Sequence, residues 1–401
     1  MLGQSTKSLT IILGALAALG AAAIDMYLPG LPRIDAELAS GSGQAQLTLG
    51  AFLIGLGVGQ LFHGAVSDAF GRRWVLIGGT VLYCLASLGC LTASDINELI
   101  GWRFVQALGA AAGSVISRAI VRDLYSMDEG ARVQSFINLA FLVTPLLAPN
   151  IGGYLLAWFG WRAIFLVLCL FGVACLLAII VRVPESLPTE RRTPLAPGTL
   201  VTGYASILSN RQTLGCLLSS ATSYACLFTY FAGSPFIYIT FFGIPEQHYG
   251  LLFGLNVLGI IATNIINARL VTRVGAIRLL WLGCAICAGG GVVLAVTAAL
   301  GIGGLPGVVI PLFFVVGSLG FVGANAQAGA MEPFPKLAAT TASMLGFSRM
   351  TLGAAMGAVL GLLHDGTPQP MGLLIGGLAL LSLLSCCLLI QPRGAATKPS
   401  K

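Results

Sequence analysis

Twelve apolar runs of about 18–25 residues, separated by short loops, constrain the fold of this chain more than any other feature. A run of this length suits a helix that crosses a lipid bilayer, where backbone hydrogen bonds must be satisfied within the segment. The chain is therefore expected to be an all-α integral membrane protein with twelve transmembrane helices. The runs lie near residues 9–31, 47–66, 74–93, 100–121, 133–157, 162–182, 212–238, 249–267, 279–300, 305–327, 340–363 and 371–390.

Composition supports a protein that crosses the membrane many times. Of the 401 residues, 57% are hydrophobic and only 9% are charged, whereas soluble domains carry about 25% charged residues. The first run is too long for the core of a signal peptide, so we expect it to remain as a spanning helix. The net charge of +7 comes from residues scattered among short loops, which argues against a nucleic-acid groove.

The basic residues predict how the chain is oriented. With the N-terminus inside, most of the 21 Lys and Arg residues fall in cytoplasmic loops. The outer loops hold only Arg33 and Arg162, and Arg103, Arg118 and Arg349 fall within spans. This asymmetry follows the positive-inside rule. Both termini are therefore predicted to be cytoplasmic.

The chain divides into two similar halves. The longest hydrophilic segment, 183–210, is rich in proline and carries charges of both signs, which is typical of a linker. We predict an N-terminal six-helix half at 1–182 and a C-terminal six-helix half at 211–401. A weak repeat supports this division, since the segment before Gly71 is echoed by the segment before Gly275, half a chain away. Two such halves suggest a secondary transporter with its substrate site between them.

Asp25 is the one acidic residue, of 14, that we place inside a predicted span. A carboxylate near the centre of a bilayer costs roughly 2.5–3.5 kcal/mol, so it normally faces a protein interior or a water-filled path. Asp25 is therefore a candidate proton carrier. Alternatively, it is a packing residue that is hydrogen-bonded to a neighbouring span.

A glycine-rich, charged loop follows the second span. It runs from Gly64 through Asp68 to Gly71, Arg72 and Arg73, and it resembles the signature loop of the major facilitator superfamily. The resemblance implies that superfamily's fold and a latch between the halves in the outward-facing state. Alternatively, these five residues form a positively charged turn with no gating role.

The fourth span contains Arg103, Gln106 and Gly109, which resemble a conserved element of the same superfamily. In relatives this arginine belongs to the proton-coupling network, so Arg103 is expected near Asp25. Arg118 could serve the same cavity. The alternative for Arg103 is a side chain that reaches toward the membrane surface.

The fifth span contains Pro145, Pro149, Gly152 and Gly153, similar to the superfamily's antiporter element. Proline bends a helix, and paired glycines let a neighbouring helix approach closely. The element is associated with export. Close packing alone would also explain it.

Further segments narrow the resemblance to the Bcr/CflA subfamily of drug:proton antiporters. They are Asp25 to Pro32 in the first span, together with Gly233 to Phe236 and Tyr249 to Asn256 around the seventh and eighth spans. The candidate substrate pocket comprises Tyr27, Gln106, Phe231, Phe236 and Tyr238. Each aromatic residue could instead serve packing or face lipid.

We therefore expect a proton-coupled antiporter of the bacterial inner membrane that exports drugs or other amphipathic molecules by alternating access. We expect a monomer that uses the proton as its coupling ion and has no metal site or other cofactor. The alternatives are a metabolite exporter or symporter on the same fold, and a transport-dead receptor or sensor. An enzyme is disfavoured, because the chain lacks His-Glu-x-x-His and Gly-x-Ser-x-Gly and offers no second buried carboxylate beside Asp25.

Overall fold

The computed structural model describes residues 2–38, 44–192 and 206–390. Within these ranges, twelve helical segments are long and apolar enough to cross a membrane. Each overlaps one of the twelve predicted runs, so the predicted helical membrane fold is confirmed. The described residues form helices, turns and loops, without a β-strand.

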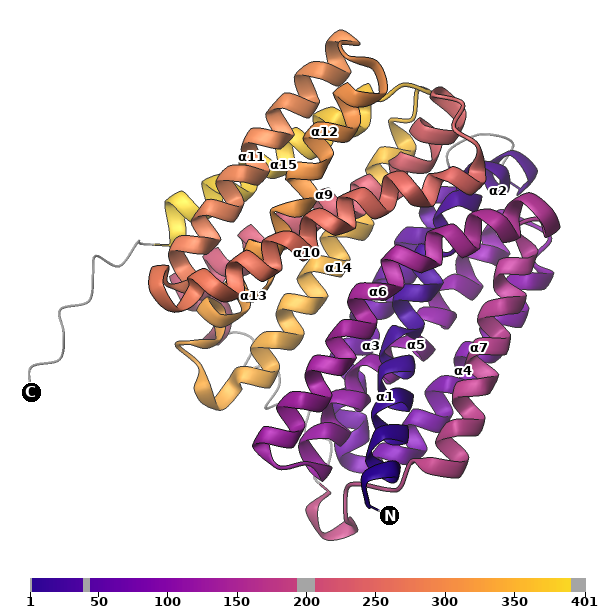
Figure 1. Cartoon of the computed structure of the whole chain (residues 1–401), viewed down its shortest axis with the longest axis vertical. Coiled ribbons are helices and arrows are strands. Elements are labelled where there is room, and N and C mark those ends of the chain that lie inside the picture. The colour runs from indigo at the N-terminus through magenta and orange to yellow at the C-terminus, as the bar shows by residue number, and fades with distance from the viewer. Residues whose placement is uncertain (1, 39–43, 193–205, 391–401) are drawn as a thin grey trace, which may run out of the picture.

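The helices form two bundles that lie side by side (Figure 1). In the first bundle, α3 and α4 pack on α5, and α1 packs on α6. In the second, α15 packs on α9 and α11. The first bundle contains α1 (Leu2–Asp25), η1 (Leu28–Gly30), α2 (Leu31–Leu38), α3 (Ala45–Phe70), α4 (Arg72–Thr92), α5 (Ile96–Leu124), α6 (Met127–Phe159) and α7 (Arg162–Arg182).

The second bundle begins with α9 (Arg211–Pro235). The seventh and tenth spans each join two helical segments: α9 continues into the π-helix η3, and α12 meets α13 at Ser318. The other elements are η3 (Phe236–Phe241), η4 (Glu246–His248), α10 (Tyr249–Val274), α11 (Ala276–Leu300), α12 (Gly304–Gly317), α13 (Leu319–Met331), η5 (Pro335–Leu337), α14 (Ala338–Leu362) and α15 (Gln369–Leu389).

The predicted division into halves falls between the two bundles. Helix α7 ends at Arg182 and α9 begins at Arg211, the last and first residues of the predicted halves. Of the predicted linker, residues 193–205 lie outside the described residues, as do residues 391–401 of the predicted C-terminal half.

The weak sequence repeat corresponds to a repeated backbone turn. Gly71, between α3 and α4, has φ 96° and ψ 151°, and Gly275, between α10 and α11, has φ 91° and ψ 148°. Residues other than glycine rarely adopt such positive φ angles. The same tight turn therefore stands at equivalent places in the two bundles.

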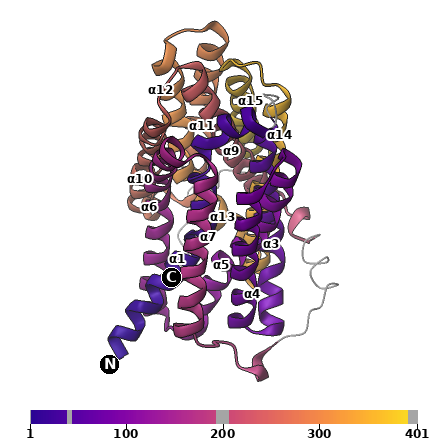
Figure 2. The ribbon, with the colours of Figure 1, turned by 90° about the vertical axis from the view of Figure 1, so that its right-hand side faces the viewer.

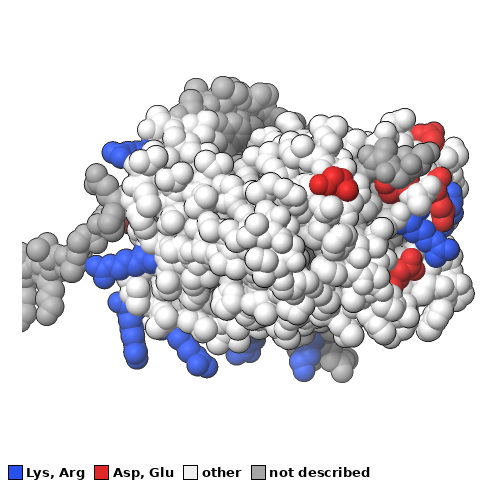
Figure 3. Space-filling model, turned by 90° about the horizontal axis from the view of Figure 1, so that it is seen from above, with Lys and Arg blue, Asp and Glu red and all other residues white. Residues whose placement is uncertain are grey.

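The charged side chains mark the two faces of the bundle. We call the face at which α1 begins the inner face, and the opposite one the outer face; Figure 2 shows the start of α1 and the region of α12 near opposite ends of the molecule. Figure 3 shows a broad uncharged band, with Asp and Glu gathered toward one end, where some Lys or Arg side chains also lie, and with further Lys and Arg along the other end and one edge. The band is the part of this surface suited to lipid.

The halves meet along two pairs of helices. Helix α3 packs on α14, and α6 packs on α10. Near the outer face, a Cβ atom on Gly153 would lie 2.6 Å from the carbonyl oxygen of Glu246 in the other half. The Arg33 Nη1 atom lies 4.0 Å from Glu246 Oε2. These contacts join the halves near the outer face.

The paired glycines of α6 have different neighbours. A side chain on Gly152 would clash with the carbonyl oxygen of Met26, which lies in the same half, whereas Gly153 faces Glu246 of the other half. Of the two, Gly153 is therefore the residue that allows the halves to close together.

Replacing Gly153 by Leu should hinder closure of the outer side, since overpacking a tight contact costs about 1–3 kcal/mol. Export should fall about tenfold, the change that 1.4 kcal/mol produces, with membrane abundance near that of the unchanged protein. Gly78→Leu is the matched control, because nothing lies within 4 Å of a Cβ atom there. Normal export by the Gly153→Leu variant would contradict this role.

Candidate functional site

Asp25 is buried near the junction of the two halves. It is the last residue of α1 and lies within the first candidate span, Lys7–Leu38. Its exposed fraction is 3%. Within the described ranges, no hydrogen bond or ion pair to its carboxylate is present. The alternative role, a packing carboxylate hydrogen-bonded to a neighbouring span, therefore lacks the bond that it requires here.

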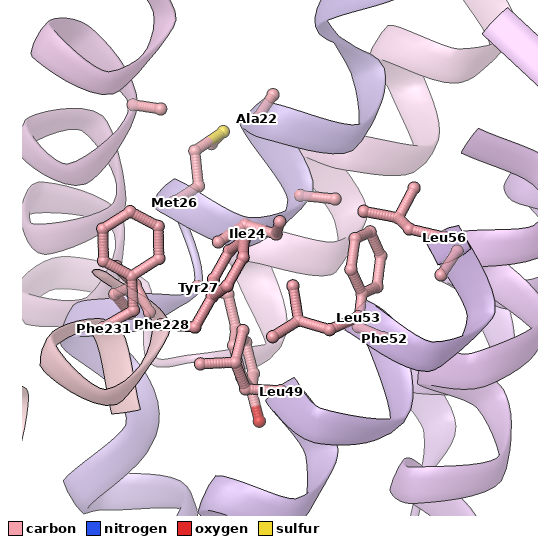
Figure 4. Packing of buried hydrophobic residues seen from close by; sticks show 14 of the residues in the cluster. Ala22, Ile24, Met26, Tyr27, Leu49, Phe52, Leu53, Leu56, Phe228 and Phe231 are labelled. Carbon is pink, nitrogen blue, oxygen red and sulfur yellow. The ribbon is translucent and has the colours of Figure 1, made fainter. Parts of the chain in front are cut away.

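Aromatic residues of the second half face this end of α1. Tyr230 and Tyr249 lie within electrostatic range of the Asp25 carboxylate. Figure 4 shows Phe228 and Phe231 of α9 on one side of Tyr27, and Phe52 of α3 on the other. Because α9 also contacts η1, Asp25 lies where a movement between the halves would change its surroundings.

Arg103 is buried inside the first half and does not reach the membrane surface. Its exposed fraction is 0%, and its guanidinium carbon lies 4.4 Å from the centroid of the Tyr27 ring and 4.1 Å from that of Phe52. Nη1 donates to the carbonyl oxygen of Ala23 at 3.1 Å and to Gln106 Oε1 at 2.7 Å. The Arg103 side chain therefore does not extend to the membrane surface, which was the alternative considered from the sequence.

Arg103 contacts α1 close to Asp25, but it does not pair with the Asp25 carboxylate in the described part of the chain. Its hydrogen bond to Ala23 ends two residues before Asp25, and no ion pair between the two side chains is present among the described residues. The Nε and Nη2 atoms are buried without a hydrogen-bond partner in that part of the chain. Cation–π contacts stabilise the guanidinium in place of a carboxylate.

The other two arginines within spans differ in their surroundings. Arg118 on α5 is exposed, with no ion pair in the described part of the chain. Arg349 on α14 is partly exposed and donates from Nε to Ser220 Oγ at 2.7 Å. The three predicted proton-coupling residues, Asp25, Arg103 and Arg118, therefore do not form one ion-paired cluster in this conformation.

The candidate pocket residues divide into three places. Tyr27 and Gln106 lie in the interior of the first half, where Tyr27 is hydrogen-bonded to Thr48 and Gln106 donates to Ser87 Oγ at 2.8 Å. Phe231 lies in an aromatic cluster of the second half, in which Tyr238 is also buried. Phe236 lies apart from both groups.

Phe236 lines a small pocket at the outer end of the interface between the halves. Its ring centroid lies 5.0 Å from that of His364, and Gln46 of α3 lines the same pocket. The five candidate residues therefore do not surround a single cavity here.

Sequence reasoning missed the polar members of the aromatic cluster. Asn256 Nδ2 donates to the Tyr230 hydroxyl at 2.9 Å, and the Ser234 and Tyr249 hydroxyls are 2.9 Å apart. Tyr230 and Phe253 stack with their ring centroids 5.8 Å apart. A polar Asn256 inside an apolar run was the available signal, since polar groups inside a span must find partners.

The predicted gating loop forms an ion network on the inner side of the first half. Arg72 is buried, with Nη2 2.6 Å from Asp68 Oδ1 and Nε 3.0 Å from Asp123 Oδ2. The Arg72 backbone N–H donates to Glu185 Oε1 at 2.9 Å, so Glu185 caps the start of α4.

The remaining loop residues belong to the same network or flank it. The Arg73 guanidinium donates to the Ile180 carbonyl at 2.8 Å. At Gly71 a side chain would strike the Glu185 carboxylate, and Gly64 accepts a hydrogen bond from Ser67. These contacts all lie within the first half and the segment that follows α7. The loop therefore does not bridge the halves in this conformation.

Comparison with known proteins places the chain in a family. The model of the Major Facilitator Superfamily matches residues 11–358. The chain is 33% identical over 382 residues to a bicyclomycin resistance protein homolog of Haemophilus influenzae, covering 95% of this chain and 96% of that protein. It is 30% identical over 387 residues to multidrug resistance protein D of Escherichia coli, covering 95% of each.

Solved structures agree on the fold. The xylose transporter XylE of Escherichia coli, in a partially occluded inward-open conformation, matches with a TM-score of 0.74 at 15% identity, covering 98% of this chain and 100% of that one. The chain therefore belongs to the major facilitator superfamily of membrane transporters, within the group of the bicyclomycin-resistance (Bcr/CflA) proteins.

Proposed function

We propose that this transporter exports small amphipathic molecules, drugs among them, and that the inward movement of protons drives the export. The observation that carries the proposal is Asp25, a carboxylate buried in a span at the junction of the halves with no described partner. Burial disfavours a carboxylate ion. A proton or a substrate group can therefore each stabilise this site.

The relatives support the substrate class. The bicyclomycin and multidrug resistance proteins match this chain over nearly its whole length. The names of those proteins describe resistance to antibiotics and drugs, and export from the cell would account for such resistance. We infer the same class of substrate for this chain.

The geometry of the halves supports alternating access. The contacts at Gly153 and Arg33 join the halves near the outer face, while the loop network around Arg72 stays within the first half and the segment that follows α7. We infer that this conformation faces inward and that the loop contacts the second half in the opposite conformation. Arg103 and Arg118 would then adjust the charge around Asp25 as the halves move.

We infer a location in the bacterial inner membrane, with both termini in the cytoplasm, and a monomeric protein. The orientation rests on the basic residues of the inner face, among them Arg122, Arg132, Arg182 and Arg273. One proton entering down 100 mV releases about 2.3 kcal/mol, enough to support a gradient of roughly 50-fold for a neutral substrate.

Asp25→Asn should abolish uphill export, because the amide is neutral like the protonated acid and cannot release a proton. For a neutral drug in vesicles, the gradient should fall from as much as roughly 50-fold to none. Binding of the neutral drug should persist. The measurement is the release of protons on addition of drug in detergent, together with accumulation in vesicles.

Asp25→Glu is the matched control, since it keeps a titratable carboxyl group at the same place. It should retain part of the proton release. If Asp25→Asn releases protons as the unchanged protein does, another residue carries the proton. Movement of protons in the same direction as the substrate would indicate a symporter, and drug binding without transport would indicate a receptor.

Asp68→Asn should reduce export about tenfold or more while leaving membrane abundance near normal, if the loop acts as a latch. The Asp68 side chain is 42% exposed, so water solvates its carboxylate and its pairing with Arg72 adds only about 0–1 kcal/mol to stability. Arg72 keeps its bond to Asp123 in this variant. Export assays with quantified membrane protein measure both quantities.

Asp123→Asn is the contrasting variant. Its carboxylate is only 14% exposed and pairs with the buried Arg72, so its loss should lower the unfolding temperature and the abundance. If Asp68→Asn loses abundance in parallel with export, the loop is structural and the latch role is wrong.

A further inference from the structure

Arg349 is a charged group inside a span that the mechanism above leaves without a role. It lies near the middle of α14, between α9 and α13. The Nε atom donates to Ser220 Oγ at 2.7 Å, and Nη2 donates to the carbonyl oxygen of Gly323 at 3.2 Å. The guanidinium carbon lies 4.3 Å from the centroid of the Tyr224 ring. Three helices of the second half therefore hold this side chain in one place.

The charge of Arg349 is not balanced by this half. The acidic residues of the C-terminal half are Glu246, Glu332 and Asp365. Each lies at or beyond the end of a helix, and no carboxylate lies within 4 Å of Arg349 in the described part of the chain. A cation within a span normally has a partner.

The guanidinium keeps hydrogen-bond donors for such a partner. Arginine carries five N–H donors in a planar fork that suits a carboxylate, and Ser220 and Gly323 are its described acceptors. Arg349 is partly exposed, and its nitrogen atoms are not among the buried groups without a partner. In this respect it differs from Arg103, whose unpaired nitrogen atoms are sealed from solvent.

An aromatic path on α9 leads from Arg349 toward Asp25. Tyr224, Phe228 and Phe231 follow one another at helical spacing, and the Phe228 and Phe231 ring centroids are 5.7 Å apart. Tyr224 stacks on Arg349, whereas in the view of Figure 4 the Phe231 ring is drawn on the side of α9 that faces Met26 and Tyr27. The seven steps along the helix from Tyr224 to Phe231 rise about 10 Å at 1.5 Å per residue.

We propose that Asp25 and Arg349 bind the two ends of a zwitterionic substrate. Its ammonium group pairs with Asp25, its carboxylate pairs with Arg349, and an aromatic body of about 10 Å lies along Phe228 and Phe231. The ammonium group takes the place of the proton on Asp25, so the same site allows substrate to be exchanged for a proton. The inference rests on the proposed export function, of which it names a substrate class.

The probe is 4′-(aminomethyl)biphenyl-4-carboxylic acid, whose two rings separate an ammonium from a carboxylate. Its methyl ester lacks the anion, and its N-acetyl derivative lacks the cation. Binding of all three compounds to the full-length protein in detergent is measured at pH 7 by calorimetry. The unchanged protein should bind the zwitterion about tenfold or more tightly than either derivative, as expected for loss of a charge-assisted hydrogen bond.

Two variants test which residue binds each end of the zwitterion. Arg349→Gln should bind the zwitterion and the methyl ester equally, and Asp25→Asn should bind the zwitterion and the N-acetyl derivative equally. Arg349→Lys keeps the positive charge and should still prefer the zwitterion over the ester. If Arg349→Gln does not fold, the inference is tested by comparing the binding of the zwitterion and its methyl ester in the unchanged protein and in Arg349→Lys.

Equal binding of the zwitterion and its ester by the unchanged protein would overturn the inference. A stable Arg349→Gln variant that keeps the preference would overturn it as well, and would leave Arg349 a structural link between α9, α13 and α14. Proton-driven export of a neutral drug without any preference for the zwitterion would overturn this inference alone. Preference for the zwitterion without proton-driven export would overturn the proposed function instead.

Discussion

The cost of placing charge in a low-dielectric interior governs the arrangement of this protein. The spans predicted from the sequence hold one carboxylate, Asp25, and three guanidinium groups, those of Arg103, Arg118 and Arg349, and each would be expensive to expose to lipid. The contacts that offset this cost differ from one charged group to the next. Arg103 is enclosed by the rings of Tyr27 and Phe52 and held by the Ala23 carbonyl. Asp25 has no such support in the described residues, so it remains the group most sensitive to its surroundings.

Arg103 also supports the end of helix α1. Asp25 is its last residue, and Pro29 follows within the short helix η1, where a proline cannot donate a backbone hydrogen bond. The Ala23 carbonyl accepts a hydrogen bond from Arg103. The arginine thus satisfies a backbone group at the helix end that places Asp25, and the two residues are linked through the backbone of α1.

On the inner face, a buried charge is stabilised by ion pairs. Arg72 is buried, yet Asp68 and Asp123 both pair with it, and Glu185 caps the start of α4. Pairing of this kind makes a buried arginine tolerable. Because the network joins α3, α4, α5 and the segment after α7, it holds the inner end of the first half together as one body. A rigid half is what rocking about a central site requires.

Much of this architecture could be predicted from the sequence, because membrane burial imposes strong local rules. The length of the apolar runs determined the twelve spans, and Asp25 stood out as an acid among apolar residues. The turn at Gly71 was readable from its glycine and charge pattern, since few residues tolerate a positive φ. Such features depend on neighbours in the chain and need no knowledge of packing.

Only the tertiary structure decided which side chains meet. Gly152 and Gly153 are adjacent in sequence, yet one faces Met26 of its own half and the other faces Glu246 of the opposite half. Arg103 bonds to the Ala23 carbonyl, two residues before Asp25, and it is enclosed between aromatic rings, not paired with the carboxylate, in the described part of the chain. The reason is that direction around a helix changes by about 100° per residue. A contact between distant helices depends on how each is rotated and tilted, and local sequence rules do not specify either quantity.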